Sequence, residues 1–132
     1  MPSKPEYPPG NPLTGRVAPK LVDKPWGYEL IWARTERYAG KILYLRNGEA
    51  LSLQYHRVKD ETIRILRGRL RLLTAAEDDG PSERILGPGD GAHIPPGLRH
   101  RMEALEDCEI LEVSTPELDD VVRLDDRYGR IK

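Results

Sequence analysis

From Trp26 onward, short apolar stretches alternate with turns rich in Gly, Pro and Asp, and this spacing limits what the chain can fold into. Gly87–Asp90 and Pro95–Gly97 are typical turn sequences. Between such turns, runs of four to eight residues with two-residue alternation predict strands. The predicted strands are Tyr28–Ala33, Lys41–Arg46, Ala50–His56, Thr62–Leu66, Arg69–Thr74, Glu83–Leu86, Gly91–Ile94, His100–Ala104 and Glu109–Ser114. Many short strands with little helical periodicity predict an all-β antiparallel sandwich or barrel.

The two ends of the chain depart from this pattern. Residues 1–20 contain six of the twelve prolines, so we expect an extended N-terminal arm rather than a helix. Pro116–Leu124 has helical character and predicts a short turn of helix. The remaining residues, 21–132, are enough for one domain with its own core.

Composition excludes several classes of partner. Charged residues make up 33% of the chain, yet the net charge is −1, which gives no electrostatic case for binding nucleic acid or a membrane surface. The apolar runs are too short to cross a bilayer, and the N-terminus lacks the apolar core of a signal peptide. The single cysteine, Cys108, rules out an internal disulfide. We therefore expect a cytoplasmic protein with neither nucleic acid nor membrane as a partner.

Two clusters about forty positions apart predict one metal site. Together they offer the amide oxygen of Gln54, the imidazoles of His56 and His100 and the carboxylate of Glu61. Mixed nitrogen and oxygen ligands of this kind suit one divalent ion of zinc, manganese, iron or nickel. Gln54 and His56 are two residues apart on a predicted strand, so both can reach the same ion from one face.

The predicted faces of the strands support this site. Glu61 leads into a strand whose same-face residues, Ile63 and Ile65, are apolar, and His100 shares its face with Met102. Burying a lone carboxylate among such residues is costly, and a metal ion removes the penalty. The alternative is that the two histidines are ordinary polar residues with hydrogen-bond partners and that Glu61 pairs with an arginine.

The strand Ala50–His56 also indicates self-association. If its polar face, which carries Gln54, points inward, then Leu51, Leu53 and Tyr55 on the opposite face need a cover. A second sheet or a second subunit would provide one, so we expect a homodimer.

The two clusters resemble the two sequence motifs of the cupin superfamily. The matching residues are Gly48, Gln54, His56, Glu61 and Gly68 in the first motif and Gly89, Pro95, Gly97 and His100 in the second. Two positions depart from the usual pattern: Ala104 stands where asparagine is common, and Gln54 replaces the first histidine. The resemblance implies a single-domain cupin jelly-roll β-barrel (double-stranded β-helix) over residues 21–132.

Four segments resemble one branch of that superfamily, the type II mannose-6-phosphate isomerase domain. They are Lys24–Glu29, Ser52–His56, Ile94–Arg101 and Asp125–Arg130. The resemblance runs from about Leu21 to Arg130 and implies a metal-dependent isomerase that interconverts an aldose and a ketose, of the mannose 6-phosphate/fructose 6-phosphate type. Its partner would be a small sugar or sugar phosphate. Such domains often end bifunctional mannose-1-phosphate guanylyltransferases, but 132 residues leave no room for a nucleotidyltransferase domain, so we do not expect guanylyl transfer.

Three cationic residues are candidates for binding a substrate phosphate. Lys24 lies in the first of these segments, and Arg127 and Arg130 lie in the last. Arginine suits two-point contact with phosphate, although surface arginines are commonly solvated or paired with carboxylates. The sequence does not name the group that moves the proton. Two other functions stay open: a cupin oxygenase using iron in the same ligands, and a carbohydrate-binding cupin without catalysis.

Overall fold

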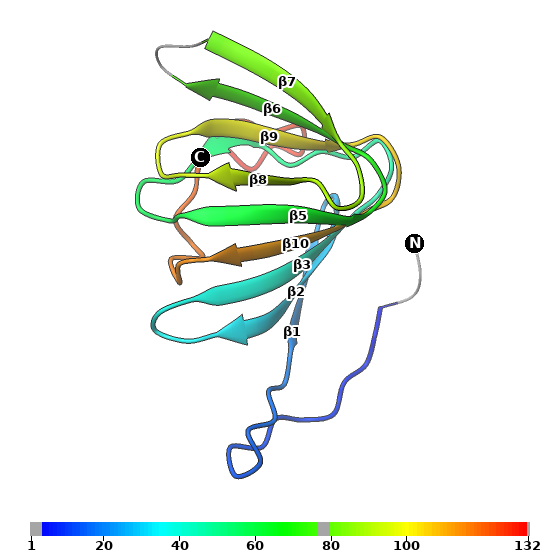
Figure 1. The fold of residues 1–132 in the computed structure, drawn as a ribbon, viewed down its shortest axis with the longest axis vertical. Helices are drawn as coiled ribbons and strands as arrows, with labels where there is room; N and C mark the ends of the chain where they lie inside the picture. The colour runs from blue at the N-terminus through cyan, green and yellow to red at the C-terminus, as the bar shows by residue number, and fades with distance from the viewer. Residues whose placement is uncertain (1–3, 77–79, 132) are drawn as a thin grey trace.

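A computed structural model describes residues 4–76 and 80–131, and over these residues the chain forms two antiparallel sheets packed face to face (Figure 1). The first sheet has the strand order β1-β2-β3-β10-β5-β8, and the second has the order β11-β4-β9-β6-β7. The strands are β1 (Lys20–Lys24), β2 (Gly27–Arg34), β3 (Ala39–Leu45), β4 (Leu53–Tyr55), β5 (Glu61–Arg67), β6 (Leu70–Ala76), β7 (Gly80–Leu86), β8 (Gly91–Ile94), β9 (Arg99–Ala104), β10 (Cys108–Ser114) and β11 (Val122–Asp125). This is the predicted all-β jelly roll.

Each predicted strand has a counterpart in the structure, and two strands were not predicted. β1 lies where the arm was expected to give way to the domain. β11 lies in the segment predicted as helical, and that prediction was wrong: β11 pairs with the edge of β4. The open edge of β4 supplies the pairing partner that makes this segment a strand. No helix long and apolar enough to cross a membrane occurs within the described ranges.

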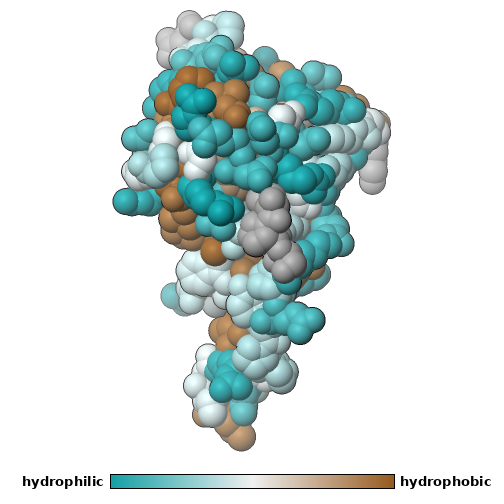
Figure 2. Space-filling model, turned by 90° about the vertical axis from the view of Figure 1, so that its right-hand side faces the viewer, coloured by the Kyte–Doolittle hydropathy of each residue, from teal (hydrophilic) through white to brown (hydrophobic). Residues whose placement is uncertain are grey.

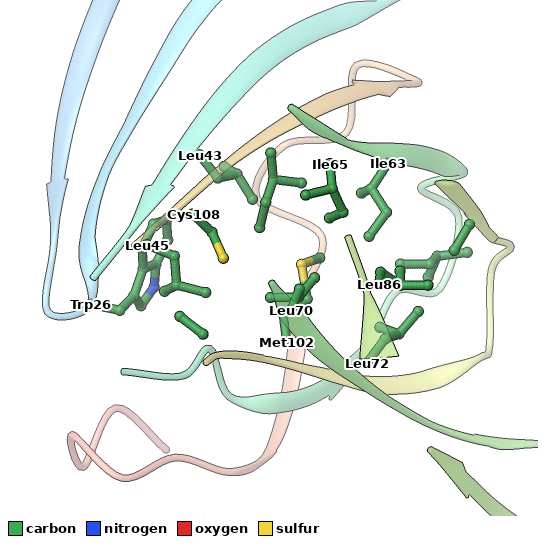
Figure 3. Close-up of a cluster of buried hydrophobic side chains, with 14 residues drawn as sticks. Trp26, Leu43, Leu45, Ile63, Ile65, Leu70, Leu72, Leu86, Met102 and Cys108 are labelled. Carbon is green, nitrogen blue, oxygen red and sulfur yellow. The ribbon is translucent and has the colours of Figure 1, made fainter. Parts of the chain in front are cut away.

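The hydrophobic core lies between the sheets, where leucine and isoleucine side chains from both pack together (Figure 3). The predicted inward faces are confirmed. Glu61, Ile63 and Ile65 on β5 are all buried and alternate with exposed residues, and His100 and Met102 on β9 are buried likewise. The polar site residues therefore share an interior with this core.

The N-terminal arm extends away from the barrel as a narrow projection (Figures 1 and 2). Its backbone turns back on itself through a bridge between Asn11 and Arg16, and Leu13 at the tip is 95% exposed. On the barrel, β11 flanks β4, whose Leu53 and Tyr55 are half-buried. β11 pairs with the edge of β4 and does not cover its outward face, whereas Leu51 packs partly against the core. The homodimer stays a prediction.

Candidate metal centre

Three potential metal ligands meet at one end of the space between the sheets. His56 directly follows β4, Glu61 begins β5 and His100 lies on β9, so the set draws on both sheets. Their ligand atoms all lie within 4.8 Å of one another. Glu61 Oε1 is 3.5 Å from His56 Nε2 and 3.4 Å from His100 Nε2. The structure therefore brings together three of the four residues predicted to bind metal.

Backbone pairing explains how segments so distant in sequence converge. Gln54 on β4 is paired with His100 on β9, which places the first cluster beside the second. The turn Pro95–Gly97 is joined to the first cluster as well, because the Gly97 amide donates to the carbonyl of His56 at 2.7 Å. The two sequence motifs are thus held together by main-chain hydrogen bonds as well as by their side chains.

Each imidazole is held in orientation by a hydrogen bond from Nδ1, the ring nitrogen that faces away from the site. This leaves Nε2 facing the site. His56 Nδ1 lies 2.5 Å from the carbonyl oxygen of Asp120, and His100 Nδ1 lies 2.9 Å from that of Leu98. Because a carbonyl only accepts, each Nδ1 carries the proton and each Nε2 presents a lone pair. Both Nε2 atoms are buried, and neither has a hydrogen-bond partner among the described residues. A divalent ion supplies the missing partner, so the residues present fit a metal.

Glu61 is held as a carboxylate by its surroundings. Burial alone would raise its pKa, but the proximity of His100 and His56 and the nearby ammonium of Lys59 lower it well below the usual range. Lys59 Nζ lies 2.8 Å from Glu61 Oε2. The carboxylate is therefore negatively charged without a metal, which is the form that a metal binds.

Lys59 and Glu112 extend the site, and neither was predicted to belong to it. Lys59 Nζ is 3.2 Å from Glu112 Oε2, and both side chains are buried. Burial favours loss of the proton from Lys59, but the charges of Glu112 and Glu61 outweigh this and raise its pKa. Burial and then the charge of Glu61 raise the pKa of Glu112 to about 7, against the opposing charges of Lys59 and Lys41. The sequence did contain a signal for Glu112, because alternation places it on the same face as Ile110.

Gln54, the fourth predicted ligand, lies on the wall of the same pocket. Its amide oxygen accepts a hydrogen bond from the Ser52 hydroxyl at 2.6 Å. An amide oxygen has two lone pairs, so this bond leaves one of them for another partner. Its role as a ligand stays a prediction.

The site opens into a pocket of about 240 Å³ between the sheets. Among its charged lining residues, seven are lysine or arginine and four are aspartate or glutamate, so the wall favours an anion. Burial lowers the pKa of Lys24, the carboxylate of Glu29 opposes this, and the neighbouring cations Lys41, Arg130 and Arg123 lower it further. These side chains thus form a cationic cluster in the pocket lining.

The three predicted phosphate-binding residues occupy different places. Lys24 and Arg130 line the pocket, and Arg130 is braced by two bonds of 3.0 Å to the Asp126 carboxylate. Arg127 is exposed, donates to the carbonyl of Gly48 at 2.6 Å and is not part of the pocket wall. Arg123, which was not predicted, also lines the pocket, beside Gln54, its pairing partner on the neighbouring strand β4. The buried Nε of Arg123 has no hydrogen-bond partner among the residues described.

Asp120 holds the segment that carries Lys59. Its carboxylate accepts backbone N–H bonds from Arg57 at 3.1 Å, Val58 at 2.7 Å and Lys59 at 2.9 Å. Burial would raise the pKa of Asp120, but these bonds lower it below its ordinary value. Since the folded-state pKa is the lower one, this stabilisation is fully present above the unfolded-state pKa and is lost as pH falls through the folded one.

We expect Asp120→Ala to lower the free energy of unfolding at pH 7 by roughly 1–3 kcal/mol, the cost of leaving such donors without their charged acceptor. The difference from wild type should shrink below about pH 4, where the wild-type carboxyl also becomes protonated. Urea unfolding at pH 7 and pH 3.5 measures both values. Asp120→Asn is the control, since it keeps an acceptor oxygen but has no charge to titrate. An equal loss for Asp120→Ala at both pH values would contradict this role.

Sequence and structure comparisons agree with the fold. A family model described as a cupin domain matches residues 42–114, which include all four predicted metal ligands. A mannose-1-phosphate guanylyltransferase, ManC, of Salmonella typhimurium (strain LT2) is 36% identical over 116 residues, 83% of this chain and 23% of that protein. The xanthan biosynthesis protein XanB of Xanthomonas campestris pv. campestris (strain B100) is 32% identical over 117 residues, 84% of this chain and 24% of that protein. The chain thus spans about a quarter of the length of these relatives.

Solved structures with the same fold are more distant in sequence. KdgF from Halomonas sp. superimposes with a TM-score of 0.65 at 20% identity, over 76% of this chain and 88% of that one. Oxalate decarboxylase from Bacillus subtilis gives a TM-score of 0.70 at 20% identity, over 80% of this chain and 30% of that one. At this level of identity the similarity shows the fold alone.

Proposed function

Since this chain belongs to the cupin family, we propose that it is a metal-dependent sugar-phosphate isomerase, of the type that interconverts mannose 6-phosphate and fructose 6-phosphate. One observation carries the proposal. The free Nε2 atoms of two buried histidines face a single carboxylate oxygen, in a pocket whose other side is rich in cations. The cofactor would be one divalent ion of zinc, manganese, iron or nickel.

His56, His100 and Glu61 would hold the ion, with the second lone pair of the Gln54 amide oxygen as a fourth ligand. When bound, a divalent ion supplies Lewis-acid stabilisation for negative charge that develops on neighbouring sugar oxygens. The chain itself orients the two imidazoles through the carbonyls of Asp120 and Leu98. Because the pKa of Lys59 is raised, its side chain remains an ammonium and donates hydrogen bonds, so we do not assign it the role of base.

The cationic side of the pocket supports a phosphorylated substrate. Lys24, Arg123 and Arg130 belong to the cationic cluster of the pocket wall, where a phosphate would accept hydrogen bonds from side chains that are already partly buried. The relatives named mannose-1-phosphate guanylyltransferase support a hexose phosphate in particular, because their name places such a compound in their reaction. We therefore propose that the phosphate binds at this wall and that the sugar extends toward Glu61.

Proton NMR in D₂O tests the function directly. Protein loaded with Zn²⁺, Mn²⁺ or Fe²⁺ is incubated with mannose 6-phosphate or fructose 6-phosphate, and the spectra are recorded after quenching and removal of metal. We expect interconversion with deuterium uptake at the carbon beside the carbonyl. No turnover and no deuterium uptake with any of these metals would overturn the isomerase proposal for these substrates.

The same assay tests the phosphate wall. We expect Arg123→Ala to raise KM for the phosphorylated sugar by about tenfold to hundredfold, the effect of losing a charge-assisted bond of roughly 1.5–3 kcal/mol. Arg127→Ala is the matched control, because that arginine lies outside the pocket wall, and its KM should stay near the wild-type value. Equal KM values for both variants would remove Arg123 from the proposed subsite.

A further inference from the structure

We propose that Glu112 is a positioning residue that acts through Lys59 to make Glu61 a one-oxygen metal ligand. This inference rests on the metal centre of the proposed function. It concerns a buried chain of three charges, Glu112–Lys59–Glu61, in which every contact comes from the described residues. These three charged side chains determine which oxygen of Glu61 can bind a metal and what net charge the protein presents to the ion.

The two oxygens of Glu61 have different surroundings. Oε1 faces the Nε2 atoms of His56 and His100, at 3.5 Å and 3.4 Å. Oε2 is 2.8 Å from the Lys59 ammonium. A carboxylate can bind a metal through one oxygen or through both. With Oε2 paired to an ammonium, Oε1 is the oxygen left for a metal, and the coordination position that Oε2 would have taken stays available.

Lys59 alone would pair with Glu61 Oε2 at a cost to metal binding, because its ammonium repels a divalent ion nearby. The Lys59 side chain is buried, and the Coulomb interaction is weakly screened there. In its carboxylate form, Glu112, 3.2 Å away from the ammonium, supplies the compensating negative charge. Without Glu112, the charges of Glu61 and Lys59 cancel, and the ion meets no net negative charge from them. With Glu112, the three side chains together present a net charge of about −1.

The sheet fixes Glu112 in place. On the pairing of β10 with β5, Ser114 lies opposite Glu61 and Glu112 lies opposite Ile63. Glu112 and Glu61 therefore project into the same interior from neighbouring strands, with Lys59 reaching between them. Burying two carboxylates and a lysine gives little stability compared with apolar residues of the same size. Their placement beside the two free imidazole nitrogens is what points to a role in metal binding.

Cobalt binding to the full chain tests this inference without relying on catalysis. The probe is Co²⁺, with affinity measured by calorimetric titration at pH 8 and coordination reported by the visible absorption bands of the bound ion. The variants are Glu112→Gln, which keeps the shape of the side chain, and Lys59→Met, which keeps the length of the side chain without its charge. Glu29→Gln is the matched control, because Glu29 is also a buried carboxylate on the pocket wall but its ion pairs are with Lys24 and Lys41.

The two variants should change different quantities. We expect Glu112→Gln to weaken Co²⁺ binding by about tenfold to hundredfold, the usual effect of losing a group that supports a ligand. Lys59→Met should not weaken binding, because a repelling charge is removed, but its absorption bands should change as Glu61 binds through both oxygens. Glu29→Gln should match wild type in affinity and in spectrum.

The double variant Lys59→Met/Glu112→Gln guards against misfolding, since it leaves no unpaired charge between the two positions. It should show the altered spectrum of Lys59→Met together with an affinity closer to wild type than that of Glu112→Gln. Wild-type affinity in Glu112→Gln, or an unchanged spectrum in both variants that lack Lys59, would overturn the positioning role while leaving the metal site intact. Absence of Co²⁺ binding by the wild-type chain would overturn the metal site itself.

Discussion

His100→Ala is expected to lose metal binding and, with it, the stabilisation that added metal gives to the folded chain. His100 is almost completely buried, its Nδ1 donates to the carbonyl of Leu98, and its free Nε2 faces Glu61 at 3.4 Å. Removing the imidazole leaves two of the three side chains that the structure brings together. We expect metal affinity to fall by a factor on the order of a hundred or more, since losing only a supporting group costs about 10–100-fold.

Thermal unfolding with and without metal measures this effect. A metal at one hundred times its Kd stabilises the native state by about 2.7 kcal/mol, so wild type should unfold at a clearly higher temperature when metal is added. His100→Ala should show no such increase at the same concentration. The control is His93→Ala, which removes an exposed histidine whose Nε2 pairs with Asp60 at 2.7 Å. A metal-dependent increase that survives in His100→Ala would refute the site, whether or not it also survives in His93→Ala.

Gly68→Ala is expected to cost more stability than any other substitution considered for this chain. Gly68 lies in the turn between β5 and β6 with φ of +85°, a conformation that L side chains rarely adopt. An added Cβ would stand 2.2 Å from the carbonyl oxygen of Asp107 and 2.9 Å from Cys108 Sγ. Because the nearest atom is backbone, a change of rotamer cannot relieve the overlap. We expect a loss of about 3 kcal/mol or more, combining strain with overpacking.

Gly48→Ala separates the two causes of that loss. Gly48 has nearly the same backbone conformation, with φ of +83°, but nothing lies within 4 Å of its added Cβ. It should lose only the conformational cost of roughly 1–2 kcal/mol. Urea unfolding of both variants gives the comparison. Similar losses at the two positions would mean that the close approach of Asp107 to the Gly68 turn is not maintained in solution.

The strands and the burial of two candidate metal ligands could be predicted because alternation records which side of a strand is buried. Glu61 and His100 each share a face with apolar residues, and the structure confirms both as buried. Glu112 carried the same signal on β10. Lys59 did not, because it lies in the connection between β4 and β5, where there is no periodicity and where tertiary contacts with two carboxylates decide its burial.

The missed strands have a related explanation. The segment Pro116–Leu124, which overlaps β11, was predicted as helical, and β11 is a strand because it pairs with the edge of β4, which is distant in sequence. Arg123 was missed for the same reason, since its place opposite Gln54 follows from that pairing. Pairing with a distant strand, which no local window of sequence contains, thus accounts for β11 and Arg123.

The division of the ligands between the two sheets has a consequence for the whole barrel. Glu61 belongs to the six-stranded sheet, whereas His100 belongs to the five-stranded one, so an ion bound by both is a cross-link between the layers. The distance between layers and the radius of the ion must then match. Met102, buried on the same strand as His100 and lining the pocket, helps to set that distance. If the site binds metal as we propose, core packing in this barrel contributes to metal selectivity, even at residues that do not touch the ion.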